Sequence, residues 1–505
     1  MIAGAIALAA FVLHLATAWR YGYFRDELYF IACAHHLAWG YVDQPPLVAL
    51  VAWMAQPFGE NLVALRLPVL LAAGLCVYAG VRIARELDGG RFAQVLAGIT
   101  IGLTPAYLAL GNILTTTSFE PLSWTLVAWC TVRLVRGARG AMWIALAAAA
   151  TFGLYGKYSI ALLLVALAIG LMLTTQRRVL ATPWLAIASA ITLLALAPNL
   201  WWQAAHGWPF FAVLAGDAAH RHAFNNGWQL ESLNLLGNAR SFALEQFLYT
   251  DPFASPVWIA GLIAPFAWPR LRDLRYLPIA YALLFAAAVV LEAKGYYIIG
   301  IYAVLISIGA VAIERAAVWL RALLLAAISV VGVATAPLSI PLLPIHTFIA
   351  YTGALGLTGR EGAPAHLIEP LFAEQFGWDR LARDVAAVYF TLPPAQRANT
   401  AIYADTYADA GAIDLFGPHL GLPAAIGTQN NYYLWGTHGY SGNPMIAIGA
   451  SRIDLLRPYY HACTLVRTSD EPLKWVVEGP APIYLCTGPI VPLQQMWPHL
   501  RWYGA

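Results

Sequence analysis

Two adjacent carboxylates and two isolated lysines are the residues of this sequence best suited to chemistry. Asp26 and Glu27 follow a long apolar stretch, and Lys157 and Lys294 are two of only three lysines among 29 basic residues. Each lysine is closely followed by tyrosine, in Gly156-Lys157-Tyr158 and in Lys294-Gly295-Tyr296-Tyr297. A carboxylate can accept the proton of an attacking hydroxyl, and an ammonium is a compact charge that suits a phosphate oxygen. This set favours transfer from a phosphate-activated donor over hydrolysis by two carboxylates.

The same residues also have structural interpretations. Asp26 would cap a helix that begins near Leu28, because Asp is a common N-cap residue. The lysines would extend to anionic headgroups at a membrane surface. The residues alone leave these alternatives open.

The composition places these residues in a membrane protein. Of the 505 residues, 60% are hydrophobic and only 11% are charged, whereas a soluble domain has about 25% charged residues. The net charge of the chain is only +3, and the basic residues are dispersed along the sequence. Neither feature indicates nucleic-acid binding. The five cysteines form no CxxC pair, so no zinc site is predicted from sulfur ligands.

About eleven apolar stretches are predicted to cross a bilayer, some with help from their flanks, since one crossing needs about 20 residues. They are residues 2–20, 62–82, 92–112, 118–136, 141–156, 158–175, 183–203, 255–268, 276–293, 296–314 and 322–342. Arginine-rich connections alternate with arginine-poor ones, the pattern in which basic loops remain cytoplasmic. This alternation places the N-terminus inside. It also predicts an outer position for the ionisable residues at the ends of the spans: Asp26, Glu27, Arg66, Glu120, Lys157, His206 and Lys294.

Two domains are expected. Residues 1–345 would form the membrane domain, with long outer loops at residues 21–61 and 204–254, the first containing short interfacial helices. Residues 350–505 lack an apolar run of 18 residues and would form an extracytoplasmic α/β domain.

In this second domain, the pattern predicts a helix at residues 375–390 and strands at residues 400–403 and 483–486. Cys463 and Cys486 both fall there, in a compartment that permits disulfides. The sequence does not decide whether they pair.

The motifs together resemble a known family. Tyr23-Phe24-Arg25-Asp26-Glu27-Leu28-Tyr29-Phe30 and Gly40-Tyr41-Val42-Asp43-Gln44-Pro45-Pro46-Leu47 are similar to the first outer loop of bacterial family 39-like GT-C glycosyltransferases. These enzymes are relatives of the protein O-mannosyltransferases and of the lipid A aminoarabinose transferase. Further similarities follow in order at residues 115–122, Gly156-Lys157-Tyr158, Trp202-Gln203 with His206-Gly207-Trp208-Pro209, and Lys294-Gly295-Tyr296-Tyr297. The tail segment Tyr432-Tyr433-Leu434-Trp435-Gly436 looks like the variable outer domain of the same group.

The resemblance implies an inverting transfer of a sugar from a polyprenyl-phosphate carrier to a hydroxyl of a glycan, lipid or protein, at the outer face of the cytoplasmic membrane. It implies that Asp26 is the general base and that Glu27 positions the acceptor or stiffens the site. We assign donor phosphate binding to Lys157, Lys294 and Arg66, and substrate binding to Glu120, Tyr158, Tyr297 and His206. Relatives often have aspartate where this chain has glutamate at position 120, so the role of that residue stays open.

Metal dependence and the exact activity also stay open. No cofactor is required by these residues, but some relatives hold a divalent metal with a carboxylate and a histidine, and His206 or the stretch from His220 to His222 could serve. The alternative for His206 is an interfacial side chain. The alternatives for Arg66 are an interfacial anchor and a partner of an acid in the first loop.

The alternative functions of the whole chain are a membrane oligosaccharide ligase or polymerase, a carbohydrate-binding membrane protein and a secondary transporter. The last is disfavoured because two related halves with polar midplane residues are not evident.

Overall fold

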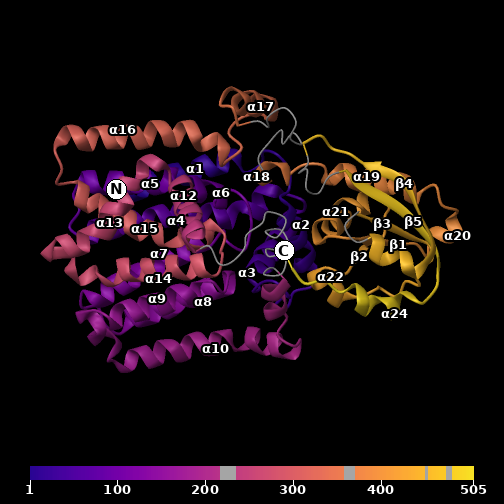
Figure 1. Cartoon of the computed structure of the whole chain (residues 1–505), viewed down its shortest axis with the longest axis horizontal. Helices are drawn as coiled ribbons and strands as arrows, with labels where there is room; N and C mark the ends of the chain where they lie inside the picture. The colour runs from indigo at the N-terminus through magenta and orange to yellow at the C-terminus, as the bar shows by residue number, and fades with distance from the viewer. Residues whose placement is uncertain (217–234, 358–369, 450–452, 474–479, 505) are drawn as a thin grey trace. The chain divides into compact units, whose positions relative to one another are not determined.

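The computed structural model describes the chain except for residues 217–234, 358–369, 450–452, 474–479 and 505 (Figure 1). The chain divides into two compact units. Unit 1 comprises Met1–Trp19, Val63–Trp201 and Trp228–Leu342, and unit 2 comprises Arg20–Leu62, Trp202–Gly227 and Leu343–Ala505.

Unit 1 is a bundle of apolar helices. Its main helices, two of which extend slightly beyond it, are α1 (Ile2–Thr17), α4 (Leu62–Glu86), α5 (Arg91–Leu103), α7 (Glu120–Val135), α8 (Ala141–Gly156), α9 (Ile160–Met172), α10 (Pro183–Ala205), α12 (Leu235–Tyr249), α13 (Ser255–Ala267), α14 (Tyr276–Val290), α15 (Tyr302–Ile313) and α16 (Val318–Thr335). Most of them coincide with a predicted apolar stretch to within a few residues. The predicted stretch 92–112 is broken into α5 and α6 (Pro105–Leu110), because the residue before a proline is driven out of the helical region.

Length and composition support membrane crossing for part of this bundle. Among the described residues, four helical segments are long and apolar enough to span a bilayer: Leu62–Glu86, Pro183–Ala205, Gly295–Ile313 and Val318–Leu338. Several other apolar helices have only 10 to 17 residues. The helices are therefore compatible with a multi-pass membrane protein, and the predicted number of about eleven crossings stays a prediction.

Burial separates the central helices of unit 1 from the peripheral ones. In the most apolar 18 residues of the segment Gly295–Ile313, 78% of the residues are buried. The corresponding share is only 17% in α10 and 11% in the segment that begins with α16. In Figure 1, α10 and α16 accordingly lie along the outside of the bundle. At the centre, Gly261 of α13 and Gly309 of α15 face the backbone of the opposite helix so closely that neither position has room for a side chain. Such small-residue contacts are typical of helices that pack in a membrane.

Helix α12 was not predicted. It lies within residues 204–254, which the sequence indicated to be a polar outer loop, and it belongs to unit 1. Asn238, Arg240 and Glu245 lower the apolar character of this stretch, which explains why the pattern did not indicate a helix.

Unit 2 combines the first loop with the C-terminal part of the chain. Its helices include α2 (Arg25–His35), α3 (Leu47–Ala55), α17 (Ile345–Ala354), α19 (Trp378–Tyr389), α21 (Tyr407–Phe416) and α22 (Asn430–Trp435). The short helices predicted in the first loop are confirmed as α2 and α3, and the helix predicted at residues 375–390 is confirmed as α19.

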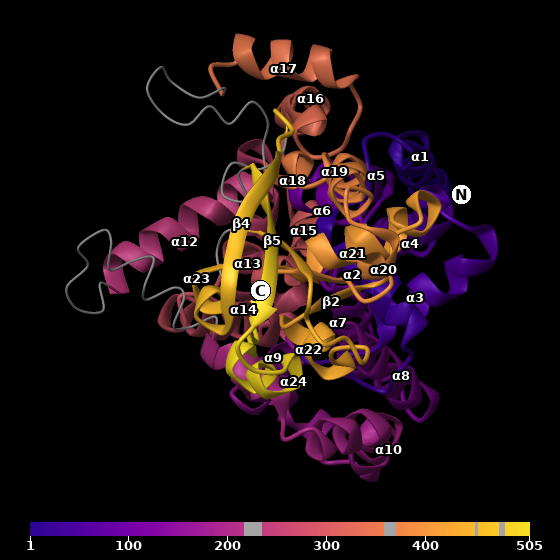
Figure 2. The same cartoon turned by 90° about the vertical axis from the view of Figure 1, so that its right-hand side faces the viewer.

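A five-stranded sheet with the order β2-β1-β3-β5-β4 forms the core of the C-terminal part. The strands are β1 (Ala401–Ala404), β2 (Ala425–Gly427), β3 (Met445–Ile448), β4 (Tyr460–Ser469) and β5 (Ala481–Pro489). β1 pairs in parallel with β2 and β3, and all four residues of β1 are buried, so both faces of the sheet are covered there. Figure 2 shows the long strands β4 and β5 side by side. A disulfide between Cys463 and Cys486 joins these two strands.

The two predicted strands correspond to β1 and to part of β5. The other three strands were not predicted. β2 and β3 have only three and four residues, and most of β4 is exposed, so none of them shows a clear alternation of apolar and polar residues.

Candidate functional site

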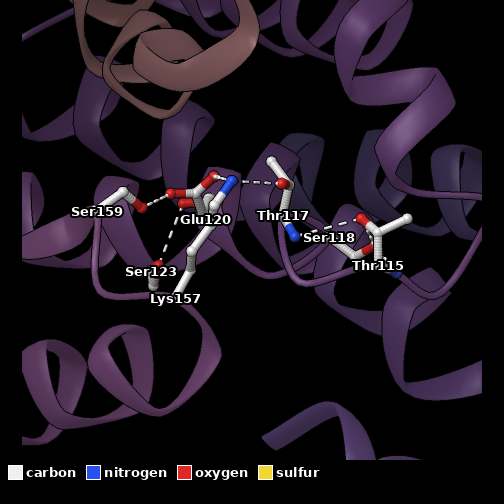
Figure 3. Close-up of polar contacts among 7 residues, drawn as sticks. All are labelled: Thr115, Thr117, Ser118, Glu120, Ser123, Lys157 and Ser159. Atoms are coloured by element: carbon white, nitrogen blue, oxygen red, sulfur yellow. Dashed lines mark hydrogen bonds and ion pairs between the residues drawn. The ribbon is translucent and has the colours of Figure 1, made fainter. Parts of the chain in front are cut away.

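Lys157 is the centre of a polar cluster in unit 1 (Figure 3). It ends α8, where its backbone is extended. Its Nζ donates to Thr117 Oγ1 over 2.8 Å and lies 3.6 Å from Glu120 Oε2. The ring centroid of Tyr297 is 4.5 Å from the same nitrogen, within the range of a cation–π contact. Three predicted site residues, Lys157, Glu120 and Tyr297, are therefore brought together.

Hydroxyl side chains build the turn that precedes α7. The N–H of Thr115 donates to Ser118 Oγ over 2.9 Å, and Ser118 Oγ donates to the carbonyl of Ile113 over 2.7 Å. The N–H of Thr117 in turn donates to Thr115 Oγ1 over 3.2 Å. This bonded turn fixes the hydroxyl of Thr117 toward the ammonium, as Figure 3 shows.

Glu120 is the first residue of α7 and is 3% exposed. Its carboxylate accepts a hydrogen bond from Ser159 Oγ and faces the ammonium of Lys157. A buried carboxylate needs such a partner, since an unpaired buried charge is costly. An ammonium has three N–H donors. One of them is bound to Thr117 and the contact with Glu120 is an ion pair at 3.6 Å, which leaves capacity for a phosphate oxygen.

Two other predicted residues of unit 1 have different surroundings. Lys294 is exposed and directly precedes the 3₁₀ segment η5 (Gly295–Ile301). The hydroxyl of Tyr158 donates to Asn199 Oδ1 of α10 over 2.8 Å.

Arg66 is fully buried in α4. Its Nη1 donates to the carbonyl of Ala18 over 2.9 Å, just beyond the end of α1. A guanidinium in this position is an internal contact between chain segments of unit 1. One of the two sequence-based interpretations of Arg66 was an interfacial anchor, which would expose its guanidinium to lipid headgroups. The burial of Arg66 does not fit that interpretation.

Asp26 and Glu27 lie in the first turn of α2, in unit 2. The helix begins at Arg25, three residues before the expected start near Leu28. The carboxylate of Glu27 accepts the N–H of Phe24 over 2.8 Å, and Glu27 is 0% exposed. Glu27 therefore binds the N–H of Phe24, the N-cap residue. Asp26 is the second residue of the helix, so the interpretation of Asp26 as the N-cap is wrong.

The hydroxyl of Tyr407 donates to Asp26 Oδ1 over 2.9 Å. Tyr407 is the first residue of α21, and both residues belong to unit 2. No sequence pattern indicated this contact, because the two residues are 381 positions apart and Tyr407 lies in no motif that resembles the family.

The second motif of the first loop is also bound to the C-terminal part within unit 2. Asn431 of α22 accepts the N–H of Val42 over 2.7 Å and the hydroxyl of Tyr29 over 3.2 Å. The same hydroxyl lies 2.9 Å from Asp43 Oδ1. These bonds fix α2 and the segment Gly40–Leu47 in one framework with α22.

His206 follows α10 and is exposed. Its ring stacks on that of Trp202 at 4.0 Å, and its Nδ1 is 2.8 Å from the Trp202 carbonyl oxygen. Within the described part of the chain, no group of three or more His, Cys, Asp and Glu side chains is arranged to hold a metal ion. His220 and His222 lie outside the described residues.

Comparisons with known proteins agree with this architecture. Residues 43–202 match the model of the family described as dolichyl-phosphate-mannose-protein mannosyltransferase. No protein with a curated description matches the sequence.

Two solved structures have the same fold over nearly the whole chain. One is ArnT from Cupriavidus metallidurans in the apo state, with 15% identity and a TM-score of 0.60 over 95% of this chain and 96% of that one. The other is the same ArnT bound to undecaprenyl phosphate, with 13% identity, a TM-score of 0.60 and the same coverage. The chain therefore has the ArnT fold, and its resemblance to the GT-C glycosyltransferases is confirmed.

Proposed function

We propose that this protein is an inverting glycosyltransferase that moves a sugar from a polyprenyl-phosphate carrier to an acceptor hydroxyl. The observation that carries this proposal is the state of Asp26. Its carboxylate is half-buried and is oriented by the hydroxyl of Tyr407, while its neighbour Glu27 accepts the N–H of Phe24 at the helix start. An oriented carboxylate that is not fully buried can accept the proton of an attacking hydroxyl. The fold of ArnT, of which one structure contains undecaprenyl phosphate, supports a lipid-phosphate donor.

In this mechanism Asp26 accepts the proton of the acceptor hydroxyl as that oxygen attacks the anomeric carbon. The bond between the anomeric carbon and the phosphate oxygen breaks, and its electron pair leaves with the phosphate. Attack from the side opposite to the leaving group inverts the configuration. The developing phosphate charge is stabilised by preorganised cations, which contribute most when they are fixed before the reaction.

Lys157 is the cation best fixed for this task, because Thr117 and Glu120 hold its ammonium. Lys294 and Arg66 are assigned to the same phosphate. Substrate contacts are assigned to Tyr158, Tyr297, His206 and Glu120. No cofactor is required by this mechanism, and a divalent metal near His206 stays an alternative.

The proposal includes a location. The chain would cross the cytoplasmic membrane about eleven times, with residues 1–345 as the membrane domain and residues 350–505 outside the cytoplasm. Reaction at the outer face would modify a glycan, lipid or protein of the cell envelope.

The test uses the full chain in nanodiscs, supplied with a panel of undecaprenyl-phosphate-linked hexoses and pentoses and with envelope extract as acceptor. Release of undecaprenyl phosphate is measured. Asp26→Asn should reduce the rate by about 10²–10⁴, the usual contribution of a general base, while undecaprenyl phosphate still binds. The matched control is Asp379→Asn in α19, which removes an exposed carboxylate paired with Arg383.

Normal turnover by Asp26→Asn would remove the mechanism. Turnover of a pyrophosphate-linked oligosaccharide alone would instead identify an oligosaccharide ligase or polymerase.

A further inference from the structure

The Asp26–Tyr407 contact joins the proposed general base to the C-terminal part of unit 2. Asp26 is half-buried on α2, and Tyr407 is 6% exposed. The hydroxyl of Tyr407 is therefore shielded from solvent and lies 2.9 Å from Asp26 Oδ1. Contacts to the backbone and to the ring of Tyr407 determine where this hydroxyl points.

The backbone of Tyr407 is fixed at the start of α21. Its N–H donates to Gln429 Oε1 over 2.7 Å. The preceding residue, Thr406, caps the helix by accepting the N–H of Asp409 over 3.1 Å. A capped helix start with a bonded N–H leaves Tyr407 little freedom to move along the helix axis.

The ring of Tyr407 is fixed from two sides. Tyr29 packs against it with ring centroids 4.8 Å apart, and the guanidinium of Arg25 lies 5.1 Å from its centroid. Arg25 is itself held by an ion pair with Glu374, at 3.2 Å. The hydroxyl therefore has a defined direction.

A close helix contact sets the distance between α21 and α2. A Cβ atom added to Gly411 would lie 2.8 Å from the backbone carbon of Leu28. Only glycine allows the two helices to approach this closely without a shift.

The electrostatic surroundings keep Tyr407 a hydrogen-bond donor. Burial raises its pKa well above the usual value of tyrosine, Asp26 and Glu374 raise it further, and Arg25 opposes the shift. The charged groups on the elements around the pair include Arg25 and Glu27 on α2, Asp409 in the first turn of α21 and Glu374 from the segment before α19. A neutral hydroxyl that donates to a carboxylate stabilises the charged form and restricts its rotation.

We propose that Tyr407 is a positioning residue for glycosyl transfer, which orients the carboxylate of Asp26 and tunes its basicity from the C-terminal part of the chain. This inference rests on the proposed function. It makes the C-terminal part a component of the catalytic apparatus rather than an appended domain.

The test compares Tyr407→Phe with Tyr432→Phe in the full chain. Tyr432 is the matched control because its buried hydroxyl also donates to a carboxylate of unit 2, that of Asp414 over 2.6 Å. In Tyr407→Phe, loss of a bond to the charged carboxylate should lower kcat about tenfold at neutral pH and move the acidic limb of the rate profile upward by about one pH unit. The KM for the undecaprenyl-phosphate sugar should not change, and Tyr432→Phe should leave the acidic limb in place.

A second replacement covers the case in which Tyr407→Phe does not fold. 3-Fluorotyrosine at position 407 keeps the ring and the hydroxyl but donates more strongly, so the acidic limb should move to lower pH. An acidic limb unchanged by the fluorotyrosine overturns the inference. If Asp26→Asn is inactive and the profile does not respond to Tyr407, only the role of Tyr407 fails. If Asp26→Asn retains turnover, the proposed function itself fails.

Discussion

The two polar clusters, one in each unit, are built in different ways. Lys157 is held by Thr117 and Glu120, which precede it by no more than 40 residues. Asp26 is held by a residue 381 positions away. The cationic cluster is therefore largely assembled from neighbouring hairpins of one helical bundle, whereas the acidic cluster exists only when the first loop and the C-terminal part fold together.

The difference has an energetic counterpart. In the Lys157 cluster, the ammonium of Lys157 and the buried carboxylate of Glu120 compensate each other's charge, so removal of one charge destabilises the other. The Asp26 cluster depends on helix packing, on a hydroxyl that donates to a carboxylate, and on the ion pair between Arg25 and Glu374. Changes that shift helices should therefore affect the Asp26 cluster more than the Lys157 cluster.

The largest effect is expected where the charge pair in unit 1 is broken. Lys157→Met leaves Glu120 buried without its cation, which should lower the free energy of unfolding by about 3 kcal/mol or more. The double variant Lys157→Met/Glu120→Gln removes both charges and should recover most of this stability. If Lys157 binds phosphate, the double variant should still bind undecaprenyl phosphate about 10- to 100-fold more weakly than the wild type.

Thermal unfolding and titration with undecaprenyl phosphate measure these two quantities separately. Wild-type affinity in the stable double variant would mean that Lys157 has a structural role only.

The second largest effect is expected when the disulfide of unit 2 is removed. The bond between Cys463 and Cys486 closes a loop with a sequence separation of 23, so its loss through Cys463→Ser/Cys486→Ser should cost about 3 kcal/mol. Hydrogen exchange should increase in β4 and β5 and leave α7 and α8 unchanged. Cys130→Ser, which changes a free cysteine in α7, is the control. Equal protection of β4 and β5 with and without the bond would contradict this expectation.

The smallest effect is expected at the contact between α2 and α21. Alanine normally stabilises a helix relative to glycine by about 1 kcal/mol, but at position 411 the added methyl group would overlap the backbone of Leu28. Gly411→Ala should therefore destabilise the protein by about 1 kcal/mol and lower turnover. Gly4→Ala is the control, because nothing lies within 4 Å of its added methyl group. A Gly411→Ala protein as stable and active as the wild type would mean that the helix contact does not set the position of Asp26.

The sequence predicted most helices of unit 1 well because they are mainly apolar, as in α8, whose predicted limits match the structure. It failed for α12, where charged side chains interrupt the pattern. It also failed for β2 and β3, since strands of three and four residues are too short to show a period.

For the candidate site, local sequence was informative about residue types but not about contacts. The motifs indicated Lys157, Tyr297 and Glu120, and these residues do meet. The capping role of Glu27 depends on a helix start that the pattern placed three residues too late. Tyr407 could not be found, because a single tyrosine in a variable region has no pattern that indicates a partner 381 residues earlier.

The assembly of unit 2 from distant parts of the chain also has a consequence for synthesis. At a translation rate of 5–20 residues per second, Tyr407 is made about 20 to 80 s after Asp26. During this interval the nascent first loop has no access to the hydroxyl that holds its carboxylate. The Tyr407–Asp26 hydrogen bond therefore cannot form until synthesis has passed residue 407.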